Sequence, residues 1–374
     1  MQRAFLADMA YNIGMAHISL VLPFALPAPE FATDLIRALE APALAALLSR
    51  HANGAVHPLP GAARVLPHEL WIARALGLAQ GLAPAFGAAA MRGLGLDPGT
   101  GTWFVVNPAH IQIAHSHLML GDVRQLDLRD EEARALFEAA RECAEYLGHA
   151  LVYGDAGTWF LRADDWDELA TASPDAAVGM NLTDWMPSGA PARALRKLQN
   201  EVQMAWHTHA TNAARERRGQ AVINGFWPWA GASIATEHAQ RLIDQASGKP
   251  AARPRVAAFE SPGWLTALAE PDLRLASLEA VVEAAVEAQG AQQDLLVACG
   301  NVAAPAIAAD WAGWLDQMQR LEAGLFAPLQ ALLARGAIKR LRLVLSHRDG
   351  HLDTLTTTMA QRKFWRRPSL ERLT

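Results

Sequence analysis

Polar side chains that could bind a ligand gather in residues 200–233, which read NEVQMAWHTHATNAARERRGQAVINGFWPWAGAS. If residues 195–213 form a helix, its period of about 3.6 residues gathers four polar side chains into one ridge. The members of this polar ridge are Arg196, Asn200, Gln203 and His207. One cation with several amide and imidazole groups can bind an anion, although a solvated helix face has the same pattern.

The opposite face of this predicted helix is apolar. It contains Leu195, Leu198, Val202, Ala205, Trp206, His209 and Ala213. Such a face is typical of a helix that packs against a core. We therefore predict that His209 is a buried histidine rather than a ligand.

A predicted strand and a small-residue turn follow the helix. Gly219 is suited to end the helix, and AVINGFWPW then predicts a strand with Asn224, Trp227 and Trp229. The small residues WAGAS, around Gly231, precede another predicted helix, an arrangement whose backbone N–H groups can hold phosphate. The segment has neither a lysine nor a complete glycine pattern, so its spacing alone is a weak phosphate signature.

Two groups of histidines have a spacing that a metal ion accepts. HIQIAHSH places His115 and His117 on one face of a predicted strand. LVLSHRDGH contains His347, Asp349 and His351, although Asp349 and the glycine after it are typical of a hairpin turn. Ordinary surface or core histidines are the alternative explanation of the first group.

The elements that must position these residues belong to a long, well-buried chain. With 374 residues, of which 51% are hydrophobic and 19% charged, the sequence predicts two globular domains or one domain with a large insert. The net charge of -5 argues against a broad basic surface for nucleic acid. Aromatic and basic side chains around Phe364 and Trp365 could still stack on bases or dock a partner, unless the aromatics hold the C-terminal segment in place.

Cysteine content and hydropathy indicate a cytoplasmic protein. Cys143 and Cys299 are the only cysteines and form no CxxC pair, which fits a reducing compartment. No apolar run approaches the roughly 20 residues that a membrane span needs, so we expect no membrane association. Met15 is a plausible natural start in place of Met1, because the first 14 residues have little periodicity.

Alternating strand and helix patterns predict an α/β fold with a mixed, mostly parallel sheet flanked by helices. HISLVLPF and DLLVAC read as buried strands, RDEEARALFEAARECAEYLG as an amphipathic helix, and RLRLVLSH with LDTLTTTM as a closing strand pair. The turn cluster GLGLDPGTG indicates a boundary near residue 98.

Several of these segments resemble known families. TASPDAAVG, ARALRKLQNEVQMAWHTHATNAARERRG and INGFWPWAGAS resemble archaeal-type cofactor-independent phosphoglycerate mutases, members of the alkaline phosphatase superfamily. In that family the last segment ends in tryptophan-x-tryptophan-glycine-x-glycine, and here Ala230 and Ala232 replace glycines around Gly231. LVLPFALP, RVLPHELWIARALGL, LQNEVQMAWHTH and KFWRR are similar to the bacterial RpfE-type regulatory proteins, which are also described as phosphoglycerate mutase-like.

This resemblance implies a phosphatase-like core with a smaller inserted α+β domain. The core would comprise residues 15–98 and 221–374, and the insert residues 99–220. The family's phosphotransfer chemistry uses two divalent metals, Mn or Zn, and a hydroxyl nucleophile.

The family's metal ligands are not evident in this sequence. Where the family's first strand ends in a metal-binding Asp, this chain has Pro23-Phe24, with no carboxylate before Glu30. Where the family has a later Asp and His, this chain offers Asn301, Pro305 and Asp310, with no histidine.

We therefore expect a phosphoglycerate-mutase-like protein that has lost its two-metal site and needs no cofactor. It would act as a ligand-binding or regulatory protein for an anionic small molecule or a protein. The predicted pocket lies between the polar ridge and the strand and turn that carry Asn224, Trp227, Trp229 and Gly231. The alternatives are an active mutase or phosphatase with Mn or Zn, and a histidine-built metal site of another kind.

Overall fold

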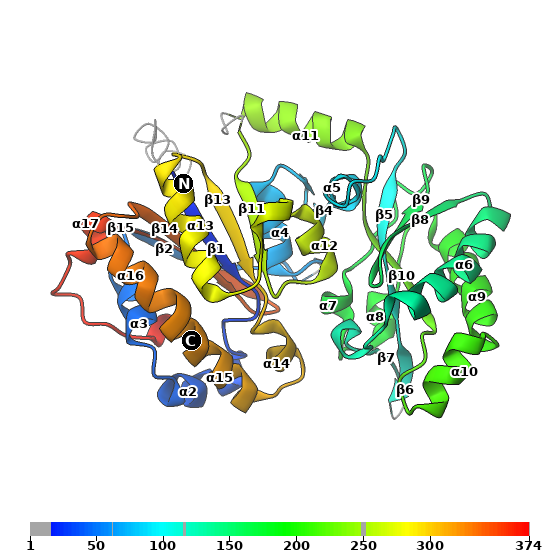
Figure 1. The fold of residues 1–374 in the computed structure, drawn as a ribbon, viewed down its shortest axis with the longest axis horizontal. Coiled ribbons are helices and arrows are strands. Elements are labelled where there is room, and N and C mark those ends of the chain that lie inside the picture. The colour runs from blue at the N-terminus through cyan, green and yellow to red at the C-terminus, as the bar shows by residue number, and fades with distance from the viewer. Residues whose placement is uncertain (1–15, 62, 115–116, 248–251, 374) are drawn as a thin grey trace. The chain divides into compact units, whose positions relative to one another are not determined.

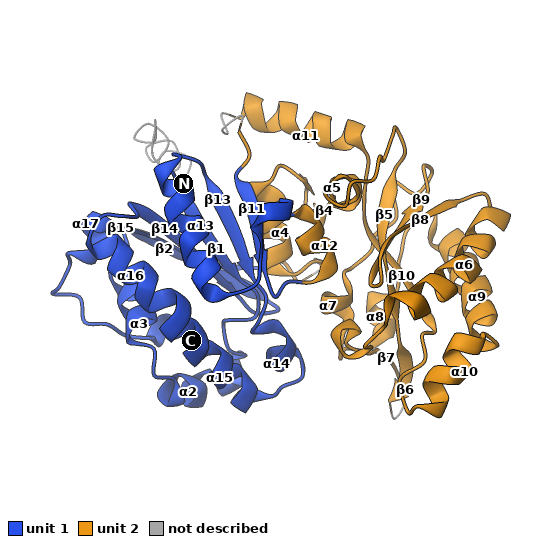
Figure 2. Cartoon of the chain, viewed as in Figure 1, with its two compact units in different colours: residues 1–58, 254–261, 269–374 blue, residues 59–253, 262–268 orange. Residues whose placement is uncertain are grey.

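The computed structural model describes residues 16–61, 63–114, 117–247 and 252–373 (Figure 1). The proposed start at Met15 therefore lies outside the described residues. The chain forms two compact units (Figure 2). Unit 1 comprises residues 1–58, 254–261 and 269–374, and unit 2 comprises residues 59–253 and 262–268.

A seven-stranded, mostly parallel sheet is the framework of unit 1. Its strand order is β12-β11-β13-β1-β14-β15-β2. The strands are β1 (Ile18–Leu22), β2 (Asn53–Pro58), β11 (Arg255–Phe259), β12 (Arg274–Leu275), β13 (Leu295–Cys299), β14 (Arg340–Ser346) and β15 (Gly350–Thr357). The first five strands in this order are parallel, whereas β15 runs antiparallel to both β14 and β2. The predicted mixed, mostly parallel α/β fold is confirmed.

Helices of unit 1 form a core with one face of this sheet. They are α2 (Pro29–Ala38), α3 (Pro42–Ser49), α13 (Leu278–Gly290), α14 (Ala303–Ile307), α15 (Trp311–Leu321), α16 (Ala327–Ala334) and α17 (Thr358–Gln361). One core joins Leu20 and Leu343 of the strands to Leu44 of α3, Val281 of α13 and Leu329 of α16. The central strands are continuous apolar runs because a parallel strand inside a sheet is covered on both faces.

Unit 2 is built on an antiparallel sheet of order β10-β5-β9-β8. Its strands are β5 (Trp103–Ala109), β8 (Ala150–Asp155), β9 (Thr158–Arg162) and β10 (Gly225–Ala232). Unit 2 also contains two small hairpins. One pairs β3 (Ala79–Gln80) with β4 (Ala83–Pro84), and the other pairs β6 (Ile111–Ala114) with β7 (His117–Leu120). Its helices are α4 (Pro67–Ala75), α5 (Gly87–Gly93), α6 (Asp130–Tyr146), α7 (Pro174–Ala177), α8 (Leu182–Trp185), α9 (Ala192–His207), α10 (Ala210–Arg217), α11 (Ile234–Ala246) and α12 (Gly263–Leu268).

Unit 2 extends beyond the predicted insert of residues 99–220. β10 follows that range in the sequence, yet it pairs with β5 along most of its length. Local patterns do not reveal this pairing, because the two strands are separated by more than a hundred residues. The domain limits inferred from the family resemblance remain a prediction.

Among the described residues, none of the helices is both long and apolar enough to cross a membrane.

Candidate functional site

The polar ridge lies on the solvent side of α9. Arg196, Asn200, Gln203 and His207 are all exposed. The apolar face points the other way, and Leu195, Leu198, Val202 and Trp206 are fully buried. The predicted division into two faces is therefore correct from Leu195 to Trp206, but Ala213, which was predicted to lie on the apolar face, is exposed.

Side chains other than the ridge connect α9 to β10. Gln199 donates from Nε2 to the Phe226 carbonyl at 2.9 Å, and the rings of Trp206 and Phe226 lie 6.4 Å apart. The apolar face of α9 therefore lies between the ridge and the strand. The two do not form the predicted pocket, because they are on opposite sides of this packed layer.

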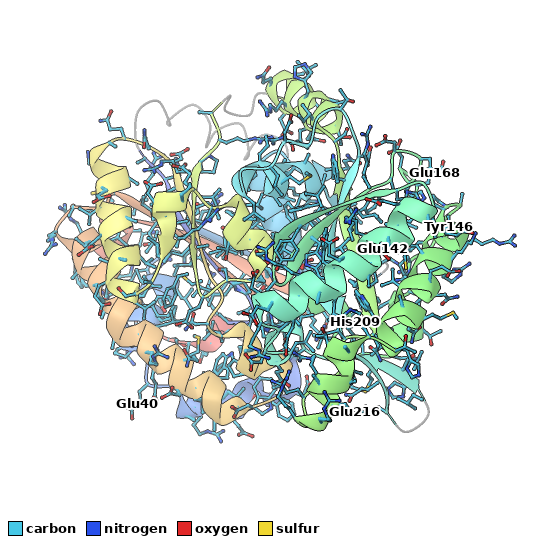
Figure 3. The ribbon with its side chains drawn as sticks, turned by 45° about the vertical axis from the view of Figure 1, so that its right-hand side comes forward. Glu40, Glu142, Tyr146, Glu168, His209 and Glu216 are labelled. Carbon is cyan, nitrogen blue, oxygen red and sulfur yellow. The ribbon has the colours of Figure 1, made fainter. Side chains whose placement is uncertain are left out.

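The predicted helix over residues 195–213 is interrupted at Thr208 and His209. His209 is half-buried rather than in the core, and its Nδ1 accepts the Thr211 N–H at 3.2 Å, which caps the start of α10 (Figure 3). The periodic pattern continues across the break, so spacing alone predicted a single helix.

The polar residues of the predicted strand and turn have structural partners. Asn224 precedes β10, accepting the Ile111 N–H at 2.7 Å and donating to the Ile111 carbonyl at 2.9 Å. Trp227 donates from Nε1 to the Ala172 carbonyl, and Trp229 donates to Asn107 Oδ1, each at 2.8 Å. Both indoles are buried. Their polar atoms are therefore satisfied within unit 2.

An irregularity within β10, directly after Trp229, explains why this segment favours small residues. β10 has a register shift between Trp229 and Ala232, and Ala230 has a φ of 53°. A Cβ on Gly231 would lie 2.5 Å from Phe104 Cε1, which is closer than carbon atoms can pack. Ala230 thus adopts a left-handed conformation that favours glycine, the residue the resembling family has there.

Two buried polar residues hold α10 in place. Asn212 donates from Nδ2 to the carbonyls of Trp206 and Ile223, at 2.9 and 2.7 Å, and its Oδ1 accepts the Ile223 N–H at 2.8 Å. Arg215, which is fully buried, pairs with Glu132 of α6 at 2.6 Å and donates to the Ala221 carbonyl at 2.9 Å. These contacts give the polar content of residues 200–233 a structural explanation.

The strand ends of unit 1 present a different set of polar groups. The parallel strands β11, β13, β1 and β14 end at one edge, where open α/β sheets commonly bind ligands. We define the strand-end row by the residues that follow these strands: Phe24, Glu260, Ser261, Asn301, His347 and Arg348. Phe24 and Glu260 have φ values of 58° and 45°, a strained conformation that often marks functional positions.

An aromatic side chain stands at the end of β1. The Phe24 N–H donates to Ser346 Oγ at 3.3 Å, and the Phe24 carbonyl accepts the Trp314 Nε1–H at 3.0 Å. The Arg348 guanidinium lies 5.8 Å from the centre of the Phe24 ring. These two backbone hydrogen bonds hold Phe24, and therefore an apolar ring, at the end of β1.

Asn301 follows β13 and is buried. Its Nδ2 donates to Gln317 at 3.1 Å, and its Oδ1 has no hydrogen-bond partner among the described residues. Ser261 Oγ donates to the carbonyls of Phe259 and Ala298, both at 3.1 Å. An unsatisfied buried acceptor costs about 1–3 kcal/mol, so Asn301 differs in kind from the satisfied amides of unit 2.

The hairpin between β14 and β15 contains the second histidine group. Ser346 pairs with His351, and His347 Nδ1 accepts the Asp349 N–H at 3.1 Å, so the predicted hairpin turn is confirmed. Burial lowers the pKa of His347, although Asp349 and Glu30 act in the opposite direction.

The structure places four of the five histidine-group candidates, and they lie in three places. His347 and Asp349 belong to the turn itself, whereas His351 lies on β15 beside His57 of β2. His117 begins β7, opposite Ala114, and His115 lies outside the described residues.

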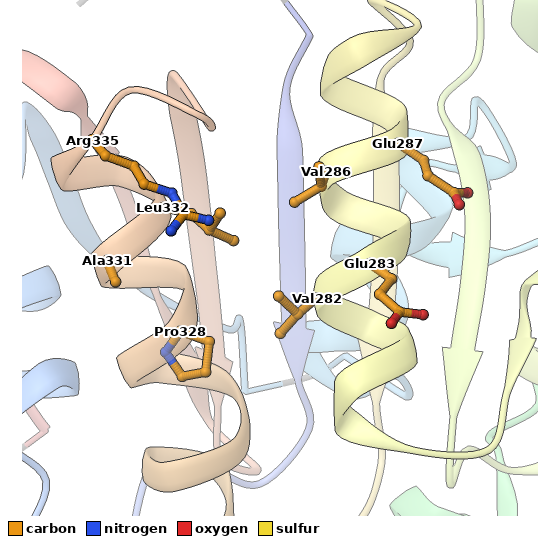
Figure 4. A pocket seen from close by; sticks show the side chains of 8 residues that line it. All are labelled: Val282, Glu283, Val286, Glu287, Pro328, Ala331, Leu332 and Arg335. Atoms are coloured by element: carbon orange, nitrogen blue, oxygen red, sulfur yellow. The ribbon is translucent and has the colours of Figure 1, made fainter.

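A groove of about 490 Å³ lies between α13 and α16. Val282 and Val286 point from α13 toward α16, whose Leu332 and Arg335 point back (Figure 4). The lining is mostly apolar and belongs to the helix layer. Sequence analysis did not indicate this groove, because it combines residues of two helices that are distant in the chain.

Cations rather than aromatics attach the C-terminal segment. Phe364 and Trp365 are exposed, whereas Lys363 Nζ donates to the His51 carbonyl at 3.1 Å and Arg366 donates to the Ser49 carbonyl at 3.3 Å. The alternative in which the aromatics hold this segment in place is therefore wrong.

Comparisons with known proteins give a likeness of fold. No family model matches the chain, and no curated protein matches it. The structure is similar to the PH0037 protein from Pyrococcus horikoshii, with 12% sequence identity and a TM-score of 0.54, covering 97% of this chain and 92% of that chain. It is also similar to a cofactor-independent phosphoglycerate mutase from Thermoplasma acidophilum, with 15% identity and a TM-score of 0.44, covering 92% of this chain and 90% of that one.

These similarities are distant. At 12% and 15% identity they concern the fold alone, and the TM-score of 0.44 with the mutase carries no further argument. The activity of this chain must be inferred from its own residues.

Proposed function

We propose that this chain is a phosphoglycerate-mutase-like protein of the alkaline phosphatase superfamily that has lost the two-metal phosphotransferase site. It acts instead as a binding or regulatory protein, and its ligand is an anionic small molecule held at the strand-end row. The alternative to a small-molecule ligand is a protein partner.

The observation that carries this proposal is the side chain at the end of β1. Phe24 stands there, fixed by Ser346 and Trp314, and cannot coordinate a metal ion. After β13 comes Asn301, an amide that already donates to Gln317. Two-metal catalysis requires carboxylate and imidazole ligands on both ions, and neither Phe24 nor Asn301 supplies such a ligand.

The same row supports an anion-binding role. Arg348 supplies a guanidinium, which forms stronger hydrogen bonds to phosphate or carboxylate oxygens than neutral donors do. Asn301 Oδ1 has capacity for one more donor, such as a ligand hydroxyl. An anion that also carries a hydroxyl group would use both features.

A turnover and metal assay tests the loss of catalysis. The purified chain is incubated with Mn and Zn, desalted, and assayed for interconversion of 3- and 2-phosphoglycerate. We expect no turnover and fewer than two retained ions per chain. Two ions with turnover would establish the alternative, an active metal-dependent mutase, and refute the proposal.

A binding assay tests the location of the ligand. Thermal shift and calorimetry with 3-phosphoglycerate and with inorganic phosphate should detect binding that Arg348→Ala weakens about tenfold, as the loss of a charge-assisted hydrogen bond would. Arg196→Ala on the polar ridge is the matched control and should leave the affinity unchanged. If only Arg196→Ala weakens binding, the ridge is the ligand site and the strand-end row is not.

A further inference from the structure

A cluster of metal-binding side chains lies at the antiparallel end of the unit 1 sheet. His57, His351 and Asp353 each offer one ligand atom, and these atoms all lie within 4.8 Å of one another. Among the residues that the structure describes, no other three His, Cys, Asp or Glu side chains meet this condition. The cluster lies on β2 and β15, and His351 is opposite Ser346 at the end of β14.

Strand register brings the three side chains together. His57 of β2 and His351 of β15 are directly opposite each other, and Asp353 follows two residues later on the same face of β15. The two imidazole rings are stacked, with centroids 4.9 Å apart and planes at 24°. A β-sheet holds such a pair more firmly than a loop would, because hydrogen bonds on both sides fix β15.

The spacing suits an ion after a small adjustment. Tetrahedral zinc with bonds of about 2.0 Å places its ligand atoms about 3.3 Å apart, so ligand atoms that lie up to 4.8 Å apart would close by up to about 1.5 Å. His57 is exposed and the other two are half-buried, which leaves room for this rotation and for an ion to enter. Two imidazoles and one carboxylate form a ligand set that divalent transition metals bind with positions left open for water.

Arg342 is the competitor for the carboxylate. Its Nε lies 3.4 Å from Asp353 Oδ1, beyond a good hydrogen-bond length, and that Nε has no hydrogen-bond partner among the described residues. This contact between Arg342 Nε and Asp353 is therefore weak, and a metal ion bound at Oδ1 would displace it.

We propose that His57, His351 and Asp353 form a binding site for one divalent transition metal ion. The ion joins the edge strand β2 to β15 and retains an open coordination position. This inference does not depend on the proposed loss of the two-metal site.

The experiment measures zinc and cobalt binding to the full chain after chelator treatment. We expect one zinc ion per chain, and a cobalt(II) spectrum whose visible bands indicate imidazole coordination. His57→Gln, His351→Gln and Asp353→Asn should each weaken the affinity at least about tenfold, whereas Arg342→Gln should strengthen it. His207→Gln, an exposed histidine on α9, is the matched control and should change nothing.

Each outcome decides a separate question. No zinc retained at micromolar concentration, or equal retention in all three ligand variants, would overturn the proposed site. If a ligand variant fails to fold, two measurements still test the site. They are the cobalt spectrum of the wild type and the increase in metal affinity expected from Arg342→Gln. A second ion that survives all three substitutions would refute the proposed function while leaving this site intact.

Discussion

Residues 200–233 of unit 2 and the strand-end row of unit 1 both carry polar side chains, but their partners differ. In unit 2, Asn212, Arg215 and Trp229 direct their polar atoms to backbone or side-chain groups of the same unit. In unit 1, the strained Phe24 and Glu260 flank Asn301, whose Oδ1 accepts no hydrogen bond from the described residues.

The buried polar side chains of residues 200–233 thus have internal partners, whereas Asn301 Oδ1 keeps an acceptor that a ligand could use. Buried polar groups in a stable scaffold are satisfied internally, since each unmet hydrogen bond costs free energy. The segment that most resembles the mutase family is such a scaffold. The resemblance therefore carries more information about the fold than about a binding site.

Glu132 provides the strongest test of the scaffold. Glu132→Ala leaves the buried Arg215 guanidinium without its carboxylate partner, and we expect the free energy of unfolding to fall by about 3–5 kcal/mol. Urea unfolding at neutral pH measures the loss. Glu138→Ala on the same helix removes an exposed ion pair with Arg141 and should cost less than about 1 kcal/mol. Equal effects of the two substitutions would contradict the scaffold interpretation.

The same carboxylate predicts a pH dependence. Burial alone would raise the pKa of Glu132, but hydrogen bonds from Arg129 and Arg215 lower it from 4.5 to about 2. Because the folded pKa lies below the unfolded one, this stabilisation is complete above pH 4.5 and is lost as the pH falls toward 2. Stability profiles of the wild type and Glu132→Gln should therefore converge in acid, and parallel profiles would exclude this linkage.

Asn212 tests the scaffold at a neutral residue. Asn212→Ala removes three hydrogen bonds, two of them to the N–H and carbonyl of Ile223, whereas the Trp206 carbonyl keeps the His209 N–H as a donor at 3.2 Å. We expect a loss of about 1–3 kcal/mol in the free energy of unfolding. Asn200→Ala, at an exposed position of α9, is the control and should be neutral within about 0.5 kcal/mol. A neutral Asn212→Ala would show that this network is not stabilising.

The two alanines that replace family glycines sharpen the comparison within one turn. Ala230→Gly should stabilise the chain by up to about 1 kcal/mol, because it relieves the left-handed φ of 53°. Ala232→Gly should destabilise it by about 0.5–1 kcal/mol, since Ala232 lies in extended backbone and packs against Ala85 and Ala88. Thermal unfolding of both variants measures the two signs, and the same sign in both would contradict the conformational explanation.

Sequence analysis predicted what local patterns encode. Continuous apolar runs identified β1 and β13, and helical spacing identified the buried face of α9. The interruption of the helix at His209 was not predicted. His209 caps α10, but its position in the sequence fits the helical spacing of the apolar residues before it.

Long-range neighbours could not be predicted from such patterns. His57 and His351 meet only because β2 pairs with β15 at the edge of the sheet, and His57 has no notable sequence context of its own. The predicted pocket between the polar ridge and β10 has a different explanation. The ridge and β10 are close in sequence, yet the packed face of α9 separates them.

The polar ridge should give the smallest effect, and it can break the comparison directly. Arg196 and His207 are exposed, so the double variant Arg196→Ala, His207→Ala should change the free energy of unfolding by no more than about 0.5 kcal/mol. Calorimetric titration with inorganic phosphate should also give the wild-type affinity. If the double variant keeps its stability but loses phosphate binding, an exposed helix face is the ligand site. The unsatisfied Asn301 Oδ1 would then need another explanation. Internal hydrogen bonding would no longer distinguish a structural residue from a ligand-binding one.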